Sequence, residues 1–200
     1  PIGPKVCLLL TLVAMVPALM LIYAKPTALR LVRGVVYCSV TSFMLGYHVH
    51  EKAILVPMII QALLLFSDEG SNAPKKGEAQ GVPTASYIFI LLSTAGTFGL
   101  FPLFNEVREL YIKTGVFLVY SLSACFIYYK QCSGRANFYF LLLLWSPFLV
   151  LHCYSELGHA YLEAYLGRKL EFLPLLLTST TSASYLIYTW ALSLLQMMQH

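Results

Sequence analysis

Long apolar runs separated by short polar turns occupy most of this chain. An α-helix needs about 20 mostly apolar residues to cross the hydrocarbon core of a bilayer, and the pattern predicts several helices of this kind. Pro17 and Pro147 lie inside two of them, where proline is expected to kink the helix. The five runs interpreted as spans in this way are residues 6–24, 86–104, 109–129, 138–152 and 172–195.

Two further apolar runs, residues 34–47 and 53–66, are shorter. An upright span needs at least about 17 residues, and neither run reaches that length. As one long helix, they would bury the polar residues between them near its middle. Two arrangements avoid this: two short spans joined by a tight loop, or a broken helix whose polar hinge lines a protein-walled cavity. Both place the polar residues beside a water-accessible site.

Other segments depart from the apolar pattern. A short basic connection is predicted after the first span, from Lys25, Arg30 and Arg33. Residues 67–85 are hydrophilic and predict a surface loop, whereas residues 153–171 mix charges with tyrosines, as an amphipathic segment at the membrane interface does. The last span contains a run of small and hydroxyl-bearing residues, which favours close packing inside a helical bundle.

The composition supports a membrane protein. Hydrophobic residues make up 58% and charged residues 11% of the 200 residues, with a mean hydropathy of +0.72. A water-soluble domain of this composition would expose too much apolar surface. The predicted fold class is all-α: residues 1–200 form a single transmembrane region, a polytopic helical bundle of about seven spans surrounded by membrane lipid. The chain starts at Pro1 without the layout of a signal peptide, so we expect its true N-terminus to lie upstream.

The charges exclude some classes of function but do not orient the bundle. The net charge is +4, yet the 13 Lys and Arg residues are scattered, so no nucleic-acid-binding face is predicted. Seven of these residues fall on one side of the seven-span arrangement and six on the other. The five cysteines show no C-x-x-C spacing and are expected to pack as small apolar side chains. Glu156 and His159 have the E-x-x-H spacing of metal-binding bundles, which need two such motifs, so we expect a solvated helix face there.

The stretch GYHVHEK at residues 46–52 is the strongest candidate for a functional site. His48, His50, Glu51 and Lys52 place four ionisable groups within five residues of an apolar chain. In membrane proteins such residues usually mark a substrate path or a binding site. Two alternatives stay open: a turn whose charges merely face water, and a metal site built from His-x-His-Glu, which lacks fixed further ligands.

Two segments resemble one known family. The string FMLGYHVHEKAILVPMI at residues 43–59 resembles the signature of the endoplasmic-reticulum enzymes that add α-1,3-linked glucose to a dolichol-linked oligosaccharide. The string FLPLLLTS at residues 172–179 resembles the same family. Some members of the family have Gln in place of the first His of this signature. The pattern with His resembles more closely the members that add the second glucose. The resemblance implies that the chain is the C-terminal part of a larger GT-C-type fold.

The resemblance also implies substrates and residue roles. The donor would be dolichyl-phosphate glucose and the acceptor a dolichyl-diphosphate oligosaccharide, in the endoplasmic reticulum membrane and with the active site facing the lumen. Apart from the resemblance, we predict no cofactor and no metal. Phosphate binds cationic and N–H-donating groups, so His50 and Lys52 are expected to contact the donor phosphate with His48 beside them. Glu51 would orient a histidine or pair with Lys52, and Tyr47 would support the group. In an extended loop His48 and His50 would face the same side.

The catalytic base of this family, an acidic residue, lies in the first luminal loop near the N-terminus, and no matching segment is present here. We therefore expect the base upstream, an inverting reaction in the whole enzyme, and no activity from these residues alone. Three alternatives remain: the sister enzyme that adds the first glucose, a membrane transporter with broken helices, and a non-catalytic membrane subunit.

Overall fold

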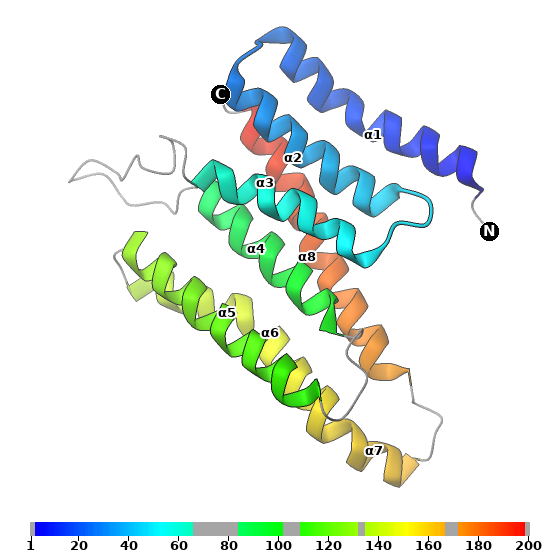
Figure 1. The fold of residues 1–200 in the computed structure, drawn as a ribbon, viewed down its shortest axis with the longest axis vertical. Coiled ribbons are helices and arrows are strands. Elements are labelled where there is room, and N and C mark those ends of the chain that lie inside the picture. The colour runs from blue at the N-terminus through cyan, green and yellow to red at the C-terminus, as the bar shows by residue number, and fades with distance from the viewer. Residues whose placement is uncertain (1–2, 66–83, 102–108, 132–134, 167–171, 199–200) are drawn as a thin grey trace.

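Every regular element in the described part of the chain is helical. The computed structural model describes residues 3–65, 84–101, 109–131, 135–166 and 172–198 (Figure 1). Its α-helices are α1 (Pro4–Ala24), α2 (Ala28–Leu45), α3 (Leu55–Leu65), α4 (Thr84–Gly99), α5 (Leu110–Gln131), α6 (Arg135–Cys153), α7 (His159–Leu166) and α8 (Leu173–Met198). A 3₁₀ helix, Glu51–Ile54, precedes α3, and a π-helical turn, Tyr154–Gly158, joins α6 to α7. The all-α prediction is confirmed.

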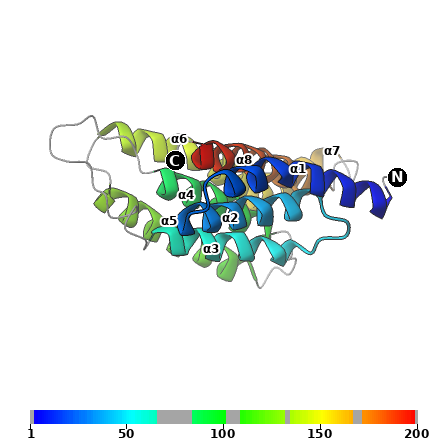
Figure 2. The same cartoon turned by 90° about the horizontal axis from the view of Figure 1, so that it is seen from above.

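Each predicted span contains one of these helices, and α7 lies in the segment predicted for the membrane interface. Residues 67–83 of the predicted hydrophilic loop and 167–171 of the interfacial segment lie outside the described residues. Because α4 begins at Thr84, the predicted loop ends two residues too late. In Figures 1 and 2 the N-terminus and the turn between α2 and α3 lie at one end of the bundle, and the C-terminus lies at the other.

The predicted basic connection around Arg30 and Arg33 is wrong, because both residues lie inside α2. The Thr27 side chain caps this helix by accepting a hydrogen bond from the backbone N–H of Arg30 at 3.2 Å. The Arg30 guanidinium turns back to α1 and donates to the carbonyl oxygen of Leu21 at 3.1 Å. The Leu21 carbonyl oxygen also accepts from the backbone N–H of Lys25 at 3.3 Å, so Arg30 adds a second donor at the end of α1. With its 18 residues α2 reaches the length of a span.

Helix α8 holds the bundle together. It packs against α1, α2, α4 and α6, and Figure 1 shows it running behind α2 and α4. Its buried positions recur every three or four residues, the spacing of one helix face: Thr178, Ser182, Leu186, Thr189, Ser193, Gln196 and Met197. The prediction that this helix packs inside the bundle is confirmed for that face, whereas Leu176, Ile187 and Leu195 on other faces are exposed.

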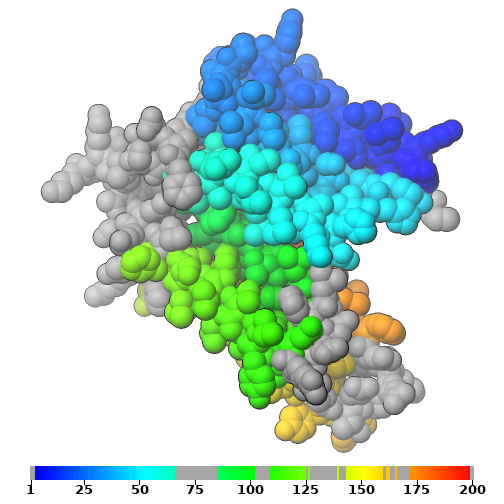
Figure 3. Space-filling view, viewed as in Figure 1, coloured from blue at the N-terminus to red at the C-terminus, as the bar shows by residue number. Residues whose placement is uncertain are grey.

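Helix α1 carries apolar side chains that no other described residue covers. Leu9, Val13 and Met20 of α1 are each at least 60% exposed. Of the described helices, α1 and α2 are long and apolar enough to cross a membrane, while Ala85–Gly99 and Leu110–Ala124 are shorter apolar stretches. Figure 3 shows α1 as a rim of exposed atoms along one side of the molecule. Such a surface is suited to contact with lipid.

Candidate functional site

A tight turn carries the polar stretch between α2 and α3. Helix α2 ends at Leu45, and the backbone N–H of Gly46 donates to the carbonyl oxygen of Ser42 at 2.9 Å. His48 has a φ of 53°, in the left-handed region that few residues other than glycine adopt. Its ring lies edge-on to the ring of Tyr47, with 4.1 Å between the centroids. Of the two predicted arrangements, the tight loop between two helices is therefore the one that forms.

The predicted alternation of side chains along an extended loop is wrong. The left-handed conformation of His48 interrupts the extended backbone, and a 3₁₀ helix begins at Glu51. The backbone N–H of Ala53 donates to the carbonyl oxygen of His50 at 2.9 Å, which closes the first turn of that helix. Ile54 is only 2% exposed and packs against Gly96 of α4, where an added Cβ would lie 3.1 Å from the Ile54 side chain. This contact anchors the turn to the bundle.

The polar side chains of the turn are exposed and have no polar side-chain partner in the described part of the chain. Residues 47–52 are all exposed, and Figure 3 shows the cyan atoms of this segment at the surface. Among the described residues, no side-chain hydrogen bond or ion pair involves His48, His50, Glu51 or Lys52. Glu51 thus makes neither of the two contacts considered from the sequence. Two imidazoles and an ammonium group remain available to an anionic ligand.

A cavity of about 210 Å³ lies beside this turn, between α2, the 3₁₀ helix, α4 and α8. It brings together Glu51 of the polar stretch and Ser179 of the second segment identified from the sequence. Small residues of α4 and α8 form much of its wall, and the complete lining is Phe43, Glu51, Ile54, Ala95, Gly96, Gly99, Leu100, Ser179, Ser182, Ala183 and Leu186. The two resembling segments therefore meet at one site.

A second polar group lies where α5 meets α6 and the π-helical turn. Lys113 of α5 forms an ion pair with Glu156, and their side chains are 12% and 21% exposed. Thr114 and the buried His152 share a hydrogen bond of 3.2 Å. The solvated helix face predicted at Glu156 and His159 is therefore wrong, because Lys113 of α5 pairs with Glu156 and the Tyr154 hydroxyl lies 3.4 Å from Nδ1 of His159. In the described ranges no three His, Cys, Asp or Glu side chains are grouped as a metal ion would require.

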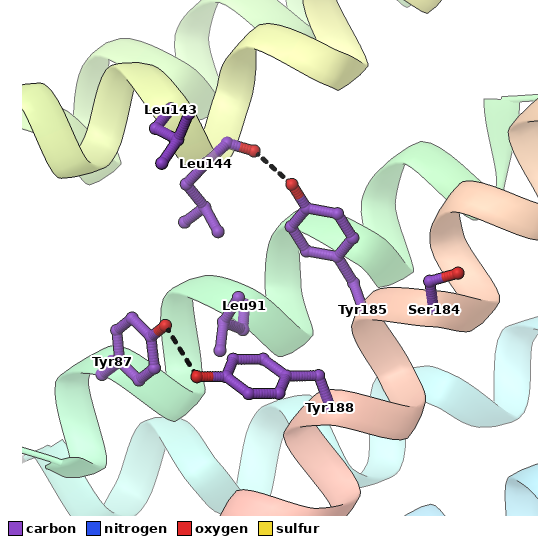
Figure 4. Close-up of a pocket in the computed structure, with 7 residues that line it drawn as sticks. All are labelled: Tyr87, Leu91, Leu143, Leu144, Ser184, Tyr185 and Tyr188. Carbon is purple, nitrogen blue, oxygen red and sulfur yellow. Dashed lines mark hydrogen bonds between the residues drawn. The ribbon is translucent and has the colours of Figure 1, made fainter.

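A larger and mostly apolar pocket of about 290 Å³ lies between α4, α6 and α8 (Figure 4). The Tyr185 hydroxyl donates to the carbonyl oxygen of Leu144 at 2.9 Å, and the Tyr87 hydroxyl donates to the hydroxyl oxygen of Tyr188 at 3.4 Å. Figure 4 shows these tyrosine side chains reaching from α4 and α8 along the pocket. Its tyrosine hydroxyls and Ser184 all take part in hydrogen bonds within the protein, in contrast to the polar side chains of the turn.

Comparison with known proteins assigns the chain to a family. The model of the ALG6, ALG8 glycosyltransferase family matches residues 1–193. The chain belongs to this family. It is 32% identical over 195 residues to the mouse dolichyl pyrophosphate Glc1Man9GlcNAc2 alpha-1,3-glucosyltransferase, an alignment that covers 94% of the chain and 34% of the mouse protein.

Proteins with the same name in two other organisms show similar identity. The Chaetomium globosum protein is 32% identical over 198 residues, covering 94% of the chain and 38% of that protein, and the Drosophila melanogaster protein, named as probable, is 33% identical over 192 residues, covering 94% and 34%. The chain thus spans about a third of the length of the relatives it matches in this glycosyltransferase family. No solved structure matches it.

The sequence of this family member did not single out Ser182, which lines the cavity beside the turn. The hydroxyl-rich run in α8 indicated packing alone, and no residue of it was singled out. The spacing held a usable signal, because Ser182 follows Ser179 by three residues and positions three apart share a helix face. What the sequence did not show was that α4 places Gly99 opposite that face and so leaves space.

Proposed function

We propose that the protein containing this chain transfers glucose from dolichyl-phosphate glucose to a dolichyl-diphosphate oligosaccharide that already carries one glucose, forming an α-1,3 linkage. The observation that carries the proposal is the turn at residues 46–52. Its exposed His50 and Lys52 have no polar side-chain partner among the described residues, and its Glu51 lines a cavity together with Ser179. The matched relatives are named for this reaction on Glc1Man9GlcNAc2. The cavity beside the turn favours a binding role over a turn whose charges only face water.

In this reaction the acceptor oxygen attacks the anomeric carbon of glucose as the bond from that carbon to the phosphate oxygen breaks. Dolichyl phosphate leaves with additional negative charge, and the acceptor proton passes to a general base outside this chain. Groups that stabilise the growing charge accelerate such a step. His50 and Lys52 are assigned to the donor phosphate, with His48 and Tyr47 holding the turn around them. The single displacement inverts the β-linked donor to an α-linked product.

The proposed setting is the endoplasmic reticulum membrane, crossed about seven times, with the turn facing the lumen. The exposed apolar surface of α1 and the family membership support a membrane location. The chain spans about a third of the length of its relatives, and in this proposal the turn and its cavity form only part of the active site. We expect residues 1–200 alone to transfer no glucose.

The test uses the complete natural protein in cells that lack the enzyme adding the second glucose. These cells accumulate the lipid-linked oligosaccharide with one glucose, and chromatography should show its conversion to longer species when the protein is supplied. Rescue only of cells that accumulate the species without glucose would instead support addition of the first glucose. Solute flux in sealed vesicles without any glucosyl transfer would support a transporter, and neither activity would support a non-catalytic subunit.

A further inference from the structure

Ser182 differs from the other buried hydroxyls of α8. Thr178 donates to the carbonyl oxygen of Pro174 at 2.7 Å, Thr189 to that of Tyr185 at 2.8 Å and Ser193 to that of Trp190 at 2.8 Å. Serine and threonine inside helices commonly satisfy their hydroxyls in this way. Ser182 is only 5% exposed, and its hydroxyl oxygen is buried without a hydrogen-bond partner among the described residues. A buried polar group of this kind calls for an explanation.

The surroundings of Ser182 place its hydroxyl at the cavity beside the turn. Ser182 lines that cavity together with Glu51 and Ser179. It faces α4 at a glycine, since a Cβ built on Gly99 would lie 3.7 Å from the Ser182 hydroxyl oxygen. Ala183, whose side chain is small, also lines this space. A ligand entering from the turn would therefore meet an unsatisfied hydroxyl at the wall formed by α8.

The chemistry of the cavity differs from that of the turn. His48, His50 and Lys52 are cationic or N–H-donating and are suited to a phosphate. The cavity presents a carboxylate, which only accepts hydrogen bonds, and two serine hydroxyls, which both donate and accept. A carboxylate repels a phosphate but pairs well with the hydroxyls of a sugar. The cavity therefore favours the neutral, hydroxyl-bearing part of a ligand whose anionic part lies at the turn.

We infer that this cavity is the sugar subsite of the donor and that Ser182 is a specificity-determining residue, its hydroxyl hydrogen-bonding a hydroxyl of the transferred glucose. Glu51 accepts a hydrogen bond from a second sugar hydroxyl across the cavity. The inference rests on the proposed function and extends it from the reaction to the atoms that recognise the sugar. A site built to bond a hydroxyl rejects an analogue that lacks it, because the protein group is then left unpaired.

The test compares Ser182→Ala with the unaltered full-length protein on dolichyl-phosphate glucose and on donors that each lack one sugar hydroxyl. With the natural donor we expect kcat/KM to fall about tenfold, the loss typical of one hydrogen bond left unmade. One deoxy donor should be transferred equally well by both proteins, because it lacks the group that Ser182 contacts. Ser193→Ala is the matched control: it removes a buried hydroxyl of α8 that bonds within the helix, and both donors should behave as with the unaltered protein.

A second variant approaches the cavity from the other side. Gly99→Ala adds a methyl group at ordinary contact distance from Ser182, so the helices can keep their positions while the cavity shrinks. We expect a higher KM for dolichyl-phosphate glucose at normal protein abundance. If Ser182→Ala and Gly99→Ala both leave donor kinetics unchanged while the unaltered protein transfers glucose, the sugar subsite is overturned and the proposed function stands. If the unaltered protein transfers none, the proposed function itself fails.

Discussion

The turn at residues 46–52 and the group around Lys113 use charged residues in opposite ways. At the junction of α5 and α6, Lys113 is paired with Glu156, and His152 is buried in a hydrogen bond with Thr114. At the turn, His50 and Lys52 are exposed and have no polar side-chain partner among the described residues. A charge that the protein pairs internally contributes to the fold, whereas one left unpaired beside a cavity is available to a ligand.

Arg30 extends the comparison to a third position. Its guanidinium is buried and donates to carbonyl oxygens at the end of α1, so it belongs with Lys113 among the structural charges. All three positions lie in a chain with only 22 charged Asp, Glu, Lys and Arg residues in 200. In this molecule, a charged residue with a partner in the protein is therefore assigned a structural role, and one without such a partner among the described residues is assigned a binding role.

The largest effect is expected from removing the ammonium group of the turn. Lys52→Met in the full-length protein should lower glucosyl transfer by about a hundredfold or more, because charge developing on the leaving phosphate loses a stabilising partner. Membrane abundance should stay normal, since Lys52 is exposed and no described residue pairs with it. Transfer assays with dolichyl-phosphate glucose, normalised to protein amount, measure the effect.

Lys113→Met is the control for that experiment. It should reduce the amount of folded protein while leaving transfer per folded molecule nearly unchanged, because it breaks the pair with Glu156. The opposite pattern, with Lys52→Met lowering abundance and Lys113→Met lowering turnover, would reverse the roles assigned to the two regions.

The shape of the turn is expected to matter nearly as much as its charge. A Cβ added at Gly46 would collide with the backbone carbonyl oxygen of Ser42 and with the Val49 side chain, and backbone gives way less easily than side chains. Gly46→Ala should therefore move the histidines and lower transfer by about tenfold to a hundredfold. Gly115→Ala is the matched control, because a Cβ at Gly115 of α5 has open space around it. Equal activity of the two variants would show that the turn tolerates displacement.

The fold was largely predictable from the sequence, for a physical reason. Apolar runs of spanning length leave few options other than helices, so seven of the α-helices coincide with the predicted runs. The start of α2 was predicted too late, because the low hydropathy of Arg30 and Arg33 indicates a polar connection between helices. Hydropathy carries no information about a guanidinium that bonds back to Leu21, nine residues earlier in the chain.

The candidate site was predictable only along the chain. The turn carries its own signal, because His48, His50, Glu51 and Lys52 are polar residues flanked by apolar ones. The cavity depends on Gly99 of α4 lying opposite Ser182 of α8, a contact between residues 83 positions apart that no local pattern encodes. The pairing of Lys113 with Glu156 depends in the same way on how α5 lies against α6.

His48 offers a way to separate conformation from chemistry within the turn. A left-handed residue other than glycine costs about 1 kcal/mol or more, and asparagine tolerates this conformation better than most. His48→Gly and His48→Asn both keep the turn and remove the imidazole. We expect each to lower transfer by a similar amount, about tenfold, in the assay used for Lys52. Full activity of His48→Gly would assign His48 a purely conformational role.

The smallest effect is expected at the structural pair, and it tests the comparison from the other side. Lys113→Glu and Glu156→Lys should each destabilise the protein by about 1–3 kcal/mol, because each leaves two like charges facing one another at a site that is mostly buried. The variant carrying both changes restores opposite charges and should recover much of the lost thermal stability in detergent, with transfer per folded molecule close to that of the unaltered protein. Recovery of stability without recovery of transfer would mean that the identity of Lys113, and not only its pairing, is needed for the reaction. The division between a paired, structural region and an unpaired, binding region would then no longer hold.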